Sequence, residues 1–439
     1  MKRINMSFPK ALFYILLFIL YSCNSSTETT EENKTHLEVY DVSCTEVWLH
    51  LKVERISLPA GGVVRIEGIK EMPVTITTND TLLFFDSLEV NREYKFKVIL
   101  QNPGQTLTTN EATARTLNTT SHIFKWETFE IGSGQSCWID DVAMIDENDI
   151  WAVGSITLKD SLEGGTMIRF NAIHWDGSKW ELKRIYYPTV CSNSSSKTSY
   201  PTKSIFLFDN KEIWTSTAGD KIAIINNGLQ SKSFCIPANE SDGGINKIAG
   251  YSNKDLYYAG SRGNLGYYNG SKWKNIETGT TKSINDIYGV KSREGKRTVF
   301  CAVSYVFQPG DYKVLKINGE NQKVDSISLE KERRVHTVWA ANERIIYTGG
   351  GGIYDNKRGY WQQSYDPIYY VRNIRGTGHN DIYACGDYCM FAHFNGLTWK
   401  RYYELYGYGA FNAIAIKGKT IILVGYKGER ALIVRGVRD

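Results

Sequence analysis

The tetrads Ile139-Asp140-Asp141-Val142 and Ile284-Asn285-Asp286-Ile287 decide the fold of this chain, because an apolar–polar–any–apolar tetrad occurs seven times. Each one opens a β-rich stretch that ends near an Asn-Gly or Asp-Gly turn. Successive tetrads begin between 36 residues (Val335 to Val371) and 63 residues (Ile139 to Thr202) apart. The seven tetrads begin at Ile139, Thr202, Ile245, Ile284, Val335, Val371 and Phe411, of which the one at Thr202 is the weakest match.

This spacing is the period of a four-stranded propeller blade, so the repeats predict an all-β, seven-bladed β-propeller over residues 122–439. The last blade lacks chain for a fourth strand. A candidate for this fourth strand occurs before the first tetrad, where Lys125-Trp126-Glu127 repeats Lys179-Trp180-Glu181 of the first blade. We therefore expect residues 123–131 to complete the last blade and close the ring, which removes an open sheet edge.

Polar residues that recur at one repeat position indicate turns and not chemistry. One acidic residue begins the second strand of four blades, and His174 and His393 both stand two residues before an Asx-Gly turn. We interpret both sets as structural, because chance ligation in separate blades is improbable. No cofactor, catalytic residue or metal ligand is therefore predicted from these repeats. The acidic positions are Asp149, Glu212, Asp255 and Asp381.

Composition excludes some classes of function. The formal net charge is +5, and no basic run stands out, so no nucleic-acid partner is expected. Aromatic residues make up 13% of the chain and prolines number only 9, which is typical of an antiparallel sheet protein and not of disorder.

The N-terminus has the pattern of an export signal. A basic start precedes the apolar run Ala11 to Leu20, which is too short to span a bilayer. The run ends at Leu20-Tyr21-Ser22-Cys23, which resembles a bacterial lipobox. This resemblance implies a signal peptide over residues 1–22, acylation of Cys23, and a membrane partner through the lipid. Residues 23–35 are predicted to be an acidic, flexible tether. Asn24 after the cysteine favours the bacterial outer membrane under the enterobacterial sorting rule.

Residues 36–118 alternate apolar and polar in about seven short strands separated by turn residues. Here the chain resembles a fibronectin type III sandwich. Trp48 matches that family's buried tryptophan, and Leu88 with Tyr94 matches its tyrosine corner, although Val90 replaces the usual proline. The resemblance implies a spacer or an adhesive module, of which the spacer is the commoner role.

The repeat array also resembles bacterial propellers with Asp-Ile-Trp-Ala-Val-Gly and Asp-Gly-x-x-Trp repeats, and more distantly the Asp-box hairpins of sialidases. The serine that precedes a full Asp-box is missing here, so this resemblance implies a fold and no sialidase activity.

Of the eight cysteines, seven remain when Cys23 is set aside. An odd number requires at least one free thiol. Cys191 and Cys235 lie in successive connections between blades and could pair. Cys385 and Cys389 flank a tight turn and could also pair. The sequence leaves both disulfides open.

Two sets of residues are candidates for ligand binding. Long, irregular connections on one end of a rigid ring are where binding usually occurs. They are 156–166, 186–201, 237–244, 305–312 and 402–410, and they carry the first candidate set: Tyr186, Tyr187, Tyr402, Tyr403, Tyr406 and Tyr408. The second set consists of the polar second residues of the tetrads, predicted to ring the channel mouth: Asp140, Lys203, Asn246, Asn285, His336, Arg372 and Asn412. For each set a purely structural role, as packed loops or as a hydrated channel lining, stays open.

These features predict a monomeric, lipid-anchored outer-membrane protein that binds a protein or glycan without catalysis. The alternative is a glycan-active hydrolase or lyase in which Asp140 and Asp286 form a carboxylate pair across the channel. An assembly scaffold is a third hypothesis. The sequence contains no nucleophile elbow, phosphate loop or zinc motif.

Overall fold

The computed structural model describes residues 34–54, 61–66, 69–74, 76, 78–102, 105–133, 136–159, 165–304, 312–329 and 334–439. Cys23, the segment 1–22 and the tether up to residue 33 lie outside this range. The described chain is all-β, as predicted, apart from three short 3-10 helices: η1 (Ala238–Glu240), η2 (Ser261–Gly263) and η3 (Tyr403–Leu405). No described helix has the length and hydrophobicity that a membrane crossing requires.

The first unit is a sandwich of two sheets. One sheet has the order β1 (Lys34–Val42), β2 (Val47–Glu54), β5 (Asp80–Phe85). The other has the order β4 (Ile69–Val74), β3 (Gly61–Ile66), β6 (Glu93–Asn102), β7 (Gln105–Thr108), with β8 (Ala112–Arg115) also on β6. Val47, Leu49 and Leu51 alternate along β2 and enter the core between the sheets, together with Leu88 and Tyr94. The Tyr94 hydroxyl accepts a hydrogen bond from the Glu89 N–H (2.8 Å).

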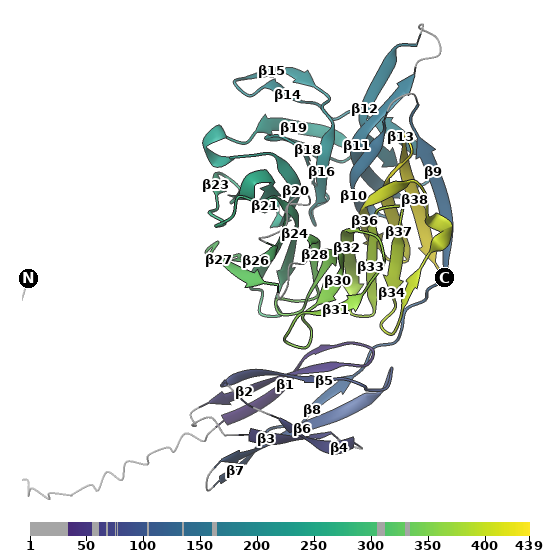
Figure 1. Ribbon diagram of the computed structural model, residues 1–439. Coiled ribbons are helices and arrows are strands. Elements are labelled where there is room, and N and C mark those ends of the chain that lie inside the picture. The colour runs from purple at the N-terminus through teal and green to yellow at the C-terminus, as the bar shows by residue number, and fades with distance from the viewer. Residues whose placement is uncertain are drawn as a thin grey trace, which may run out of the picture.

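The remaining strands, apart from one two-stranded sheet described below, form four-stranded antiparallel sheets arranged around a centre (Figure 1). We call these ring sheets 1 to 7. Sheet 1 consists of β10 (Trp138–Asp146), β11 (Asp149–Lys159), β12 (Met167–Trp175) and β13 (Trp180–Lys183). Sheet 2 consists of β16 (Thr202–Leu207), β17 (Ile213–Thr217), β18 (Lys221–Asn226) and β19 (Leu229–Cys235). Sheet 3 consists of β20 (Ile245–Ser252), β21 (Asp255–Gly260), β22 (Leu265–Tyr268) and β23 (Trp273–Asn275). Sheet 4 consists of β24 (Ile284–Lys291), β25 (Arg297–Val303), β26 (Lys313–Asn318) and β27 (Val324–Ser328). Sheet 5 consists of β28 (Val335–Ala340), β29 (Ile346–Gly350), β30 (Gly352–Asp355) and β31 (Gln362–Tyr365). Sheet 6 consists of β32 (Val371–Gly378), β33 (Asp381–Gly386), β34 (Phe391–Phe394) and β35 (Trp399–Arg401).

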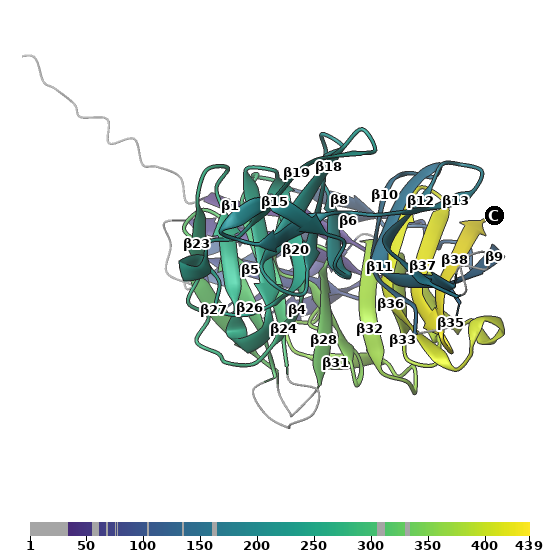
Figure 2. The ribbon, with the colours of Figure 1, turned by 90° about the horizontal axis from the view of Figure 1, so that it is seen from above.

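Ring sheet 7 joins the two ends of the array. It has the order β36 (Gly409–Lys417), β37 (Thr420–Lys427), β38 (Arg430–Arg438), β9 (Phe124–Ile131), so a strand from before the first tetrad pairs with the last strand of the chain. The innermost strands of neighbouring ring sheets contact one another, and β36 returns to contact β10. Figure 2 shows β10 and β11 beside β37 and β38, where sheets 1 and 7 meet.

The two ends of the ring sheets differ. At one end, which we call the short-turn end, tight turns join the first strand to the second and the third to the fourth. Gly177, Gly270 and Gly396 supply the positive φ (93°, 92° and 99°) that these turns need, as the Asx-Gly dipeptides predict. The predicted long connections lie at the opposite, long-loop end, and residues 160–164 and 305–311 of them fall outside the described residues. Residues 187–198 form a further two-stranded sheet there, β14 (Tyr187–Val190) and β15 (Asn193–Thr198).

The sandwich is fixed to the short-turn end and does not hang free as a spacer would. Trp48 faces away from the sandwich core and is fully buried among propeller residues, including Trp339 and Ile374. This position differs from the buried core tryptophan of the predicted fold, because Trp48 lies on the opposite side of β2 from Val47 and Leu49. The contact joins β1, β2 and β5 to ring sheets 4 to 6, as Figure 1 shows for the sandwich beside β30, β31 and β34.

Candidate functional site

A β-bulge at the start of each innermost strand positions the predicted channel-mouth residues. In ring sheet 1, Ile139 pairs with Gly154 and Asp141 pairs with Val153, so Asp140 has no partner on β11. The same register shift skips the second tetrad residue in the other six ring sheets. A bulged residue leaves the ladder, and its side chain is turned away from the sheet pairing. All seven predicted residues line one cavity of about 470 Å³: Asp140, Lys203, Asn246, Asn285, His336, Arg372 and Asn412.

The charged groups at the mouth form ion pairs, one between ring sheets 1 and 2 and one within ring sheet 6. Lys203 Nζ lies 2.6 Å from Asp140 Oδ1, and Trp138 Nε1 donates to Asp140 Oδ2 (2.7 Å). Arg372 Nε lies 2.6 Å from Asp387 Oδ1, and its Nη1 donates to Asn412 Oδ1 (2.9 Å). Because the carboxylates are used in these pairs, the mouth holds fixed charges of both signs.

In five of the seven tetrads the third residue carries a role that the sequence analysis missed. Its side chain accepts a hydrogen bond from the backbone N–H of the fourth tetrad residue in the next ring sheet. This bond recurs at five junctions: Asp141 with Ile205, Ser204 with Ile248, Asp286 with Val338, Thr337 with Ile374, and Asn373 with Ile414. The signal was present in the sequence, because a polar residue occupies this position in every tetrad except the last, where it is Ala413.

Both members of the predicted carboxylate pair are bound by neighbouring side chains. Asp286 is 3% exposed, and Arg375 binds both of its oxygens at 2.8 Å while Thr337 Oγ1 donates to Oδ2. Burial would raise the pKa of Asp286, but the Arg375 guanidinium outweighs it and holds the pKa below its usual range. Asp140 is bound by Lys203 and Trp138 on its two oxygens. The lowered pKa of Asp286 does not suit a general acid, which needs a raised pKa.

His336 is the exception among the mouth residues, because its Nδ1 atom is buried and has no hydrogen-bond partner among the described residues. Its ring meets the ring of Tyr370 edge-on, with centroids 5.6 Å apart. Burial lowers the pKa of His336 to about 4, so the imidazole is neutral at physiological pH. It therefore brings hydrogen-bonding capacity and no charge to the cavity.

Two of the predicted loop tyrosines belong to the core, which corrects that prediction. Tyr187 is fully buried in β14, and its hydroxyl contacts the hydroxyls of Thr202 (3.0 Å) and Thr215 (2.9 Å). Tyr402 is 1% exposed and donates to the His122 carbonyl (2.8 Å). Both connections fold back onto the ring sheets, so one member of each adjacent tyrosine pair points inward.

The other tyrosines at ring sheets 6 and 7 gather on the surface. Tyr403 packs on Tyr406 (centroids 5.2 Å apart), Tyr406 on Tyr369 (5.7 Å), and Tyr369 on Tyr388 (4.7 Å). Tyr408 is 84% exposed, Tyr403 62% and Tyr388 51%. We call these five residues the tyrosine surface. Sequence reasoning missed Tyr388, which lies outside the long loops, in a turn within ring sheet 6. Tyr186 is also exposed but bonds Gln230 of ring sheet 2 and lies apart from this set.

The tyrosine surface borders the cavity. Tyr388 follows Asp387, which binds the cavity residue Arg372. The Tyr408 carbonyl accepts a hydrogen bond from the N–H of Gly428 (2.8 Å), and Gly428 itself lines the cavity. Both features therefore lie at the long-loop end, opposite the docked sandwich.

The repeated turn residues are structural, in agreement with the sequence interpretation. His174 Nε2 lies 2.8 Å from Asp149, and His393 Nε2 lies 3.0 Å from Asp381. Each histidine on a third strand thus fixes the acidic residue that begins the second strand of its own sheet.

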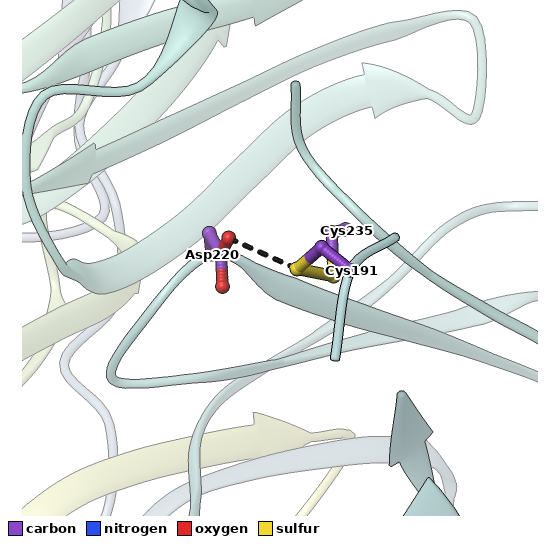
Figure 3. Close-up of side chains that lie close together, drawn as sticks. All are labelled: Cys191, Asp220 and Cys235. Atoms are coloured by element: carbon purple, nitrogen blue, oxygen red, sulfur yellow. Dashed lines mark hydrogen bonds between the residues drawn. A yellow bond between two sulfur atoms is a disulfide. The ribbon is translucent and has the colours of Figure 1, made fainter. Parts of the chain in front are cut away.

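The cysteines settle the disulfide question for the described chain. Cys191 and Cys235 form a disulfide, whereas Cys385 and Cys389 are free and buried. Among the described residues, one group has the spacing of metal ligands, namely Cys191, Asp220 and Cys235 (Figure 3). A thiolate is what binds a metal, and the disulfide consumes both thiols. This group is therefore a bridged pair beside a carboxylate.

Comparison with known proteins identifies the fold. No family model matches the chain, and no curated protein matches it in sequence. Among solved structures, the chain is similar to "YCF48 bound to D1 peptide", with 16% identity and a TM-score of 0.52 over 73% of this chain and 100% of that one. It is also similar to the WD40 β-propeller domain of Doa1, with 12% identity and a TM-score of 0.51 over 72% of this chain and 98% of that one. At these identities the likeness concerns the fold. The ring sheets thus have the architecture of a β-propeller.

Proposed function

We propose that this chain is an exported, lipid-anchored protein whose seven-bladed propeller binds a protein ligand at its long-loop end. The tyrosine surface carries the proposal. Tyr388, Tyr403 and Tyr408 are each more than half exposed, and they continue into the partly buried Tyr369 and Tyr406. Tyrosine is enriched at protein interfaces, because its ring buries apolar area while its hydroxyl keeps a hydrogen-bond partner.

The position of the sandwich also favours the long-loop end as the binding face. The sandwich covers the short-turn end of ring sheets 4 to 6, so that part of the propeller is not available to another partner. One propeller of similar fold is described in complex with a peptide. We extend to this chain only the class of ligand, a protein segment, and take its location from the tyrosine surface.

The cellular address is part of the proposal. We propose that residues 1–22 are a signal peptide, that Cys23 is acylated, and that residues 23–35 tether the folded part to the outer membrane. We assign the sandwich to the fibronectin type III class, because its two sheets have the strand orders given above and Tyr94 bonds the backbone five residues upstream. Mass spectrometry of the mature N-terminus tests whether Cys23 is acylated. Membrane fractionation of a Cys23→Ala variant tests the anchor, and a variant that stays equally membrane-bound would contradict the proposal.

The ligand is tested with a soluble fragment, residues 34–439, which keeps β1 complete. We expect the fragment to retain a defined protein from extracts of the source cells, and the triple variant Tyr388→Ala, Tyr403→Ala, Tyr408→Ala to lose it. The matched control is Tyr360→Ala, a tyrosine that is 52% exposed in a turn at the short-turn end. Retention of glycans on an array, with no protein captured, would contradict the proposed ligand class. Equal capture by the triple variant would contradict the proposed face.

A further inference from the structure

The central cavity differs from a neutral, water-filled channel in how its charges are exposed. It is lined by the acidic residues Asp140, Asp141 and Asp286 and by the basic residues Lys203, Lys247 and Arg372, so its formal charge balances. The exposures do not balance. The side chains of the three acidic residues are 13%, 4% and 4% exposed, whereas those of the three basic residues are 37%, 16% and 32% exposed. Asp387, the partner of Arg372, is 34% exposed but does not line the cavity, so among the lining residues the more exposed charges are positive.

The three cations also keep N–H groups that the described residues do not use. A lysine ammonium has three N–H groups. Lys203 gives one to Asp140 and Lys247 gives one to Asp141, each at 2.6 Å. Arg372 uses Nε and Nη1, and the described residues offer no partner to its Nη2. The carboxylates, in contrast, are bound by neighbouring sheets, including both oxygens of Asp141 through Lys247, Ser204 and the N–H of Ile205.

These cations come from ring sheets 2, 3 and 6, so they surround the cavity instead of forming one patch. Their acidic partners fix them in place, because each pair joins two different ring sheets or a strand and its turn. Charged donors that are held before binding lose little freedom when a ligand arrives. The cavity volume of about 470 Å³ falls within the usual range for small-molecule sites, about 300–1,000 Å³.

We propose that this cavity is a binding site for a carboxylate group, held by Lys203 and Arg372 at the mouth and by Lys247 below them. The amide nitrogens of Asn246 and Asn285 donate to Ile284 and Ser304, so their Oδ1 atoms would accept from a donor group next to the carboxylate. The carboxylate belongs either to a small organic acid or to the end of a peptide chain. The cavity borders the tyrosine surface, so the second source would place a peptide end in the cavity and its preceding residues on the tyrosines. The inference itself needs only the cavity and can hold where the proposed protein ligand does not.

The experiment is direct titration of the fragment 34–439 with two matched pairs of probes at low ionic strength. The first pair is glutarate and glutaramide, and the second is acetyl-triglycine with a free and with an amidated C-terminus. We expect at least one acid to bind and its amide to bind at least about tenfold more weakly, since a hydrogen bond between charged groups is about twice as strong as a neutral one. Binding of glutarate alone assigns the site to small acids, and binding of the free peptide assigns it to chain ends.

Variants locate the site. Lys203→Gln and Arg372→Gln should each weaken binding of the acid by about tenfold or more, the scale of one charged hydrogen bond. The matched control, Lys179→Gln, removes a lysine that is 66% exposed at the short-turn end and should bind as the unaltered fragment does. Thermal melting of each variant separates loss of binding from loss of folding, and Arg372→Lys, which keeps the charge, provides a second readout. Equal binding of acids and amides, no binding of any probe, or acid binding that Lys203→Gln and Arg372→Gln leave intact would each overturn the proposal.

Discussion

Trp48 of the sandwich stacks on His379 of the propeller, with ring centroids 5.0 Å apart and planes inclined by 25°. The Trp48 Nε1 also donates to the Lys357 carbonyl (2.8 Å), and His379 Nε2 lies 3.1 Å from Asp41 Oδ2. Lys357 in turn pairs with Glu46. The contact thus combines a fully buried aromatic ring with ion pairs around it, which is the arrangement of an interface that holds two domains at a fixed angle.

We expect Trp48→Ala to uncouple the two domains. Removal of a fully buried tryptophan costs about 3–5 kcal/mol, and here that loss falls on the interface and not on either core. Calorimetry should show one transition in the unaltered protein and two in the variant. Leu49→Ala, on the other face of β2, is the control: it should lower the stability of the sandwich without separating the transitions. A single, unshifted transition for Trp48→Ala would show that the contact contributes nothing.

The hydrogen bonds between ring sheets predict a second effect. Thr337 is fully buried, accepts from the Ile374 N–H (3.1 Å) and donates to Asp286. Thr337→Val keeps the shape but leaves that N–H unpaired, so the free energy of unfolding should fall by about 1–3 kcal/mol. Urea denaturation measures the change. Thr198→Val, at an exposed position on β15, should change stability by less than about 0.5 kcal/mol. Equal values for the two variants would contradict the role given to the third tetrad residue.

The disulfide leads to a third prediction. Cys191 and Cys235 are 44 residues apart and join the loop after β14 to the end of β19. A cross-link of this span stabilises a fold by about 2–4 kcal/mol, mainly through the unfolded chain. The double variant Cys191→Ser, Cys235→Ser should lose that amount in denaturant titrations. A reducing agent should destabilise the unaltered protein equally and leave the double variant unchanged, because the other described cysteines are buried free thiols.

The repeat pattern of the tetrads was sufficient to predict the β-propeller class and the cavity lining. The second residue of every tetrad occupies the same position in its blade, so these seven residues lie at one level of the ring. They line the same cavity for that reason, independently of their residue type. The bulge that turns them toward the cavity could not be read from the pattern, because any residue type fits a bulge. Asp286 and Asp140 share the cavity as expected, but their pairing with Arg375 and Lys203 depends on packing between sheets.

The aromatic residues show where the sequence was less informative. Adjacent tyrosines such as Tyr186 and Tyr187 look alike in a loop, and only the fold of β14 onto ring sheet 2 separates the exposed residue from the buried one. Trp48 did carry a usable signal. Val47 and Leu49 place one face of β2 in the core, so a large apolar residue between them indicates that the other face is covered as well.

The partly buried imidazole of His336, whose Nδ1 atom is inaccessible, predicts how stability depends on pH. Burial lowers the pKa of this histidine from its ordinary 6.5 to about 4, so the folded protein keeps it neutral where the unfolded chain takes up a proton. The unfolded state therefore binds more protons between pH 6.5 and 4, and the free energy of unfolding falls as the pH falls through this window. Each pKa unit corresponds to about 1.4 kcal/mol. His122, whose pKa is also lowered to about 4 by burial and by His393, adds to the same slope.

Urea denaturation at steps between pH 7 and pH 4 measures this slope. We expect His336→Gln to reduce the slope, because glutamine does not titrate, and to leave the stability at pH 4 closer to that at pH 7. His36→Gln, which replaces an exposed histidine on β1, is the matched histidine-to-glutamine control. If His336→Gln and His36→Gln have the same profile as the unaltered protein, then His336 is protonated as easily in the folded state as in the unfolded chain. Its Nδ1 would then have a partner, and the cavity would contain one more positive charge below pH 6.5.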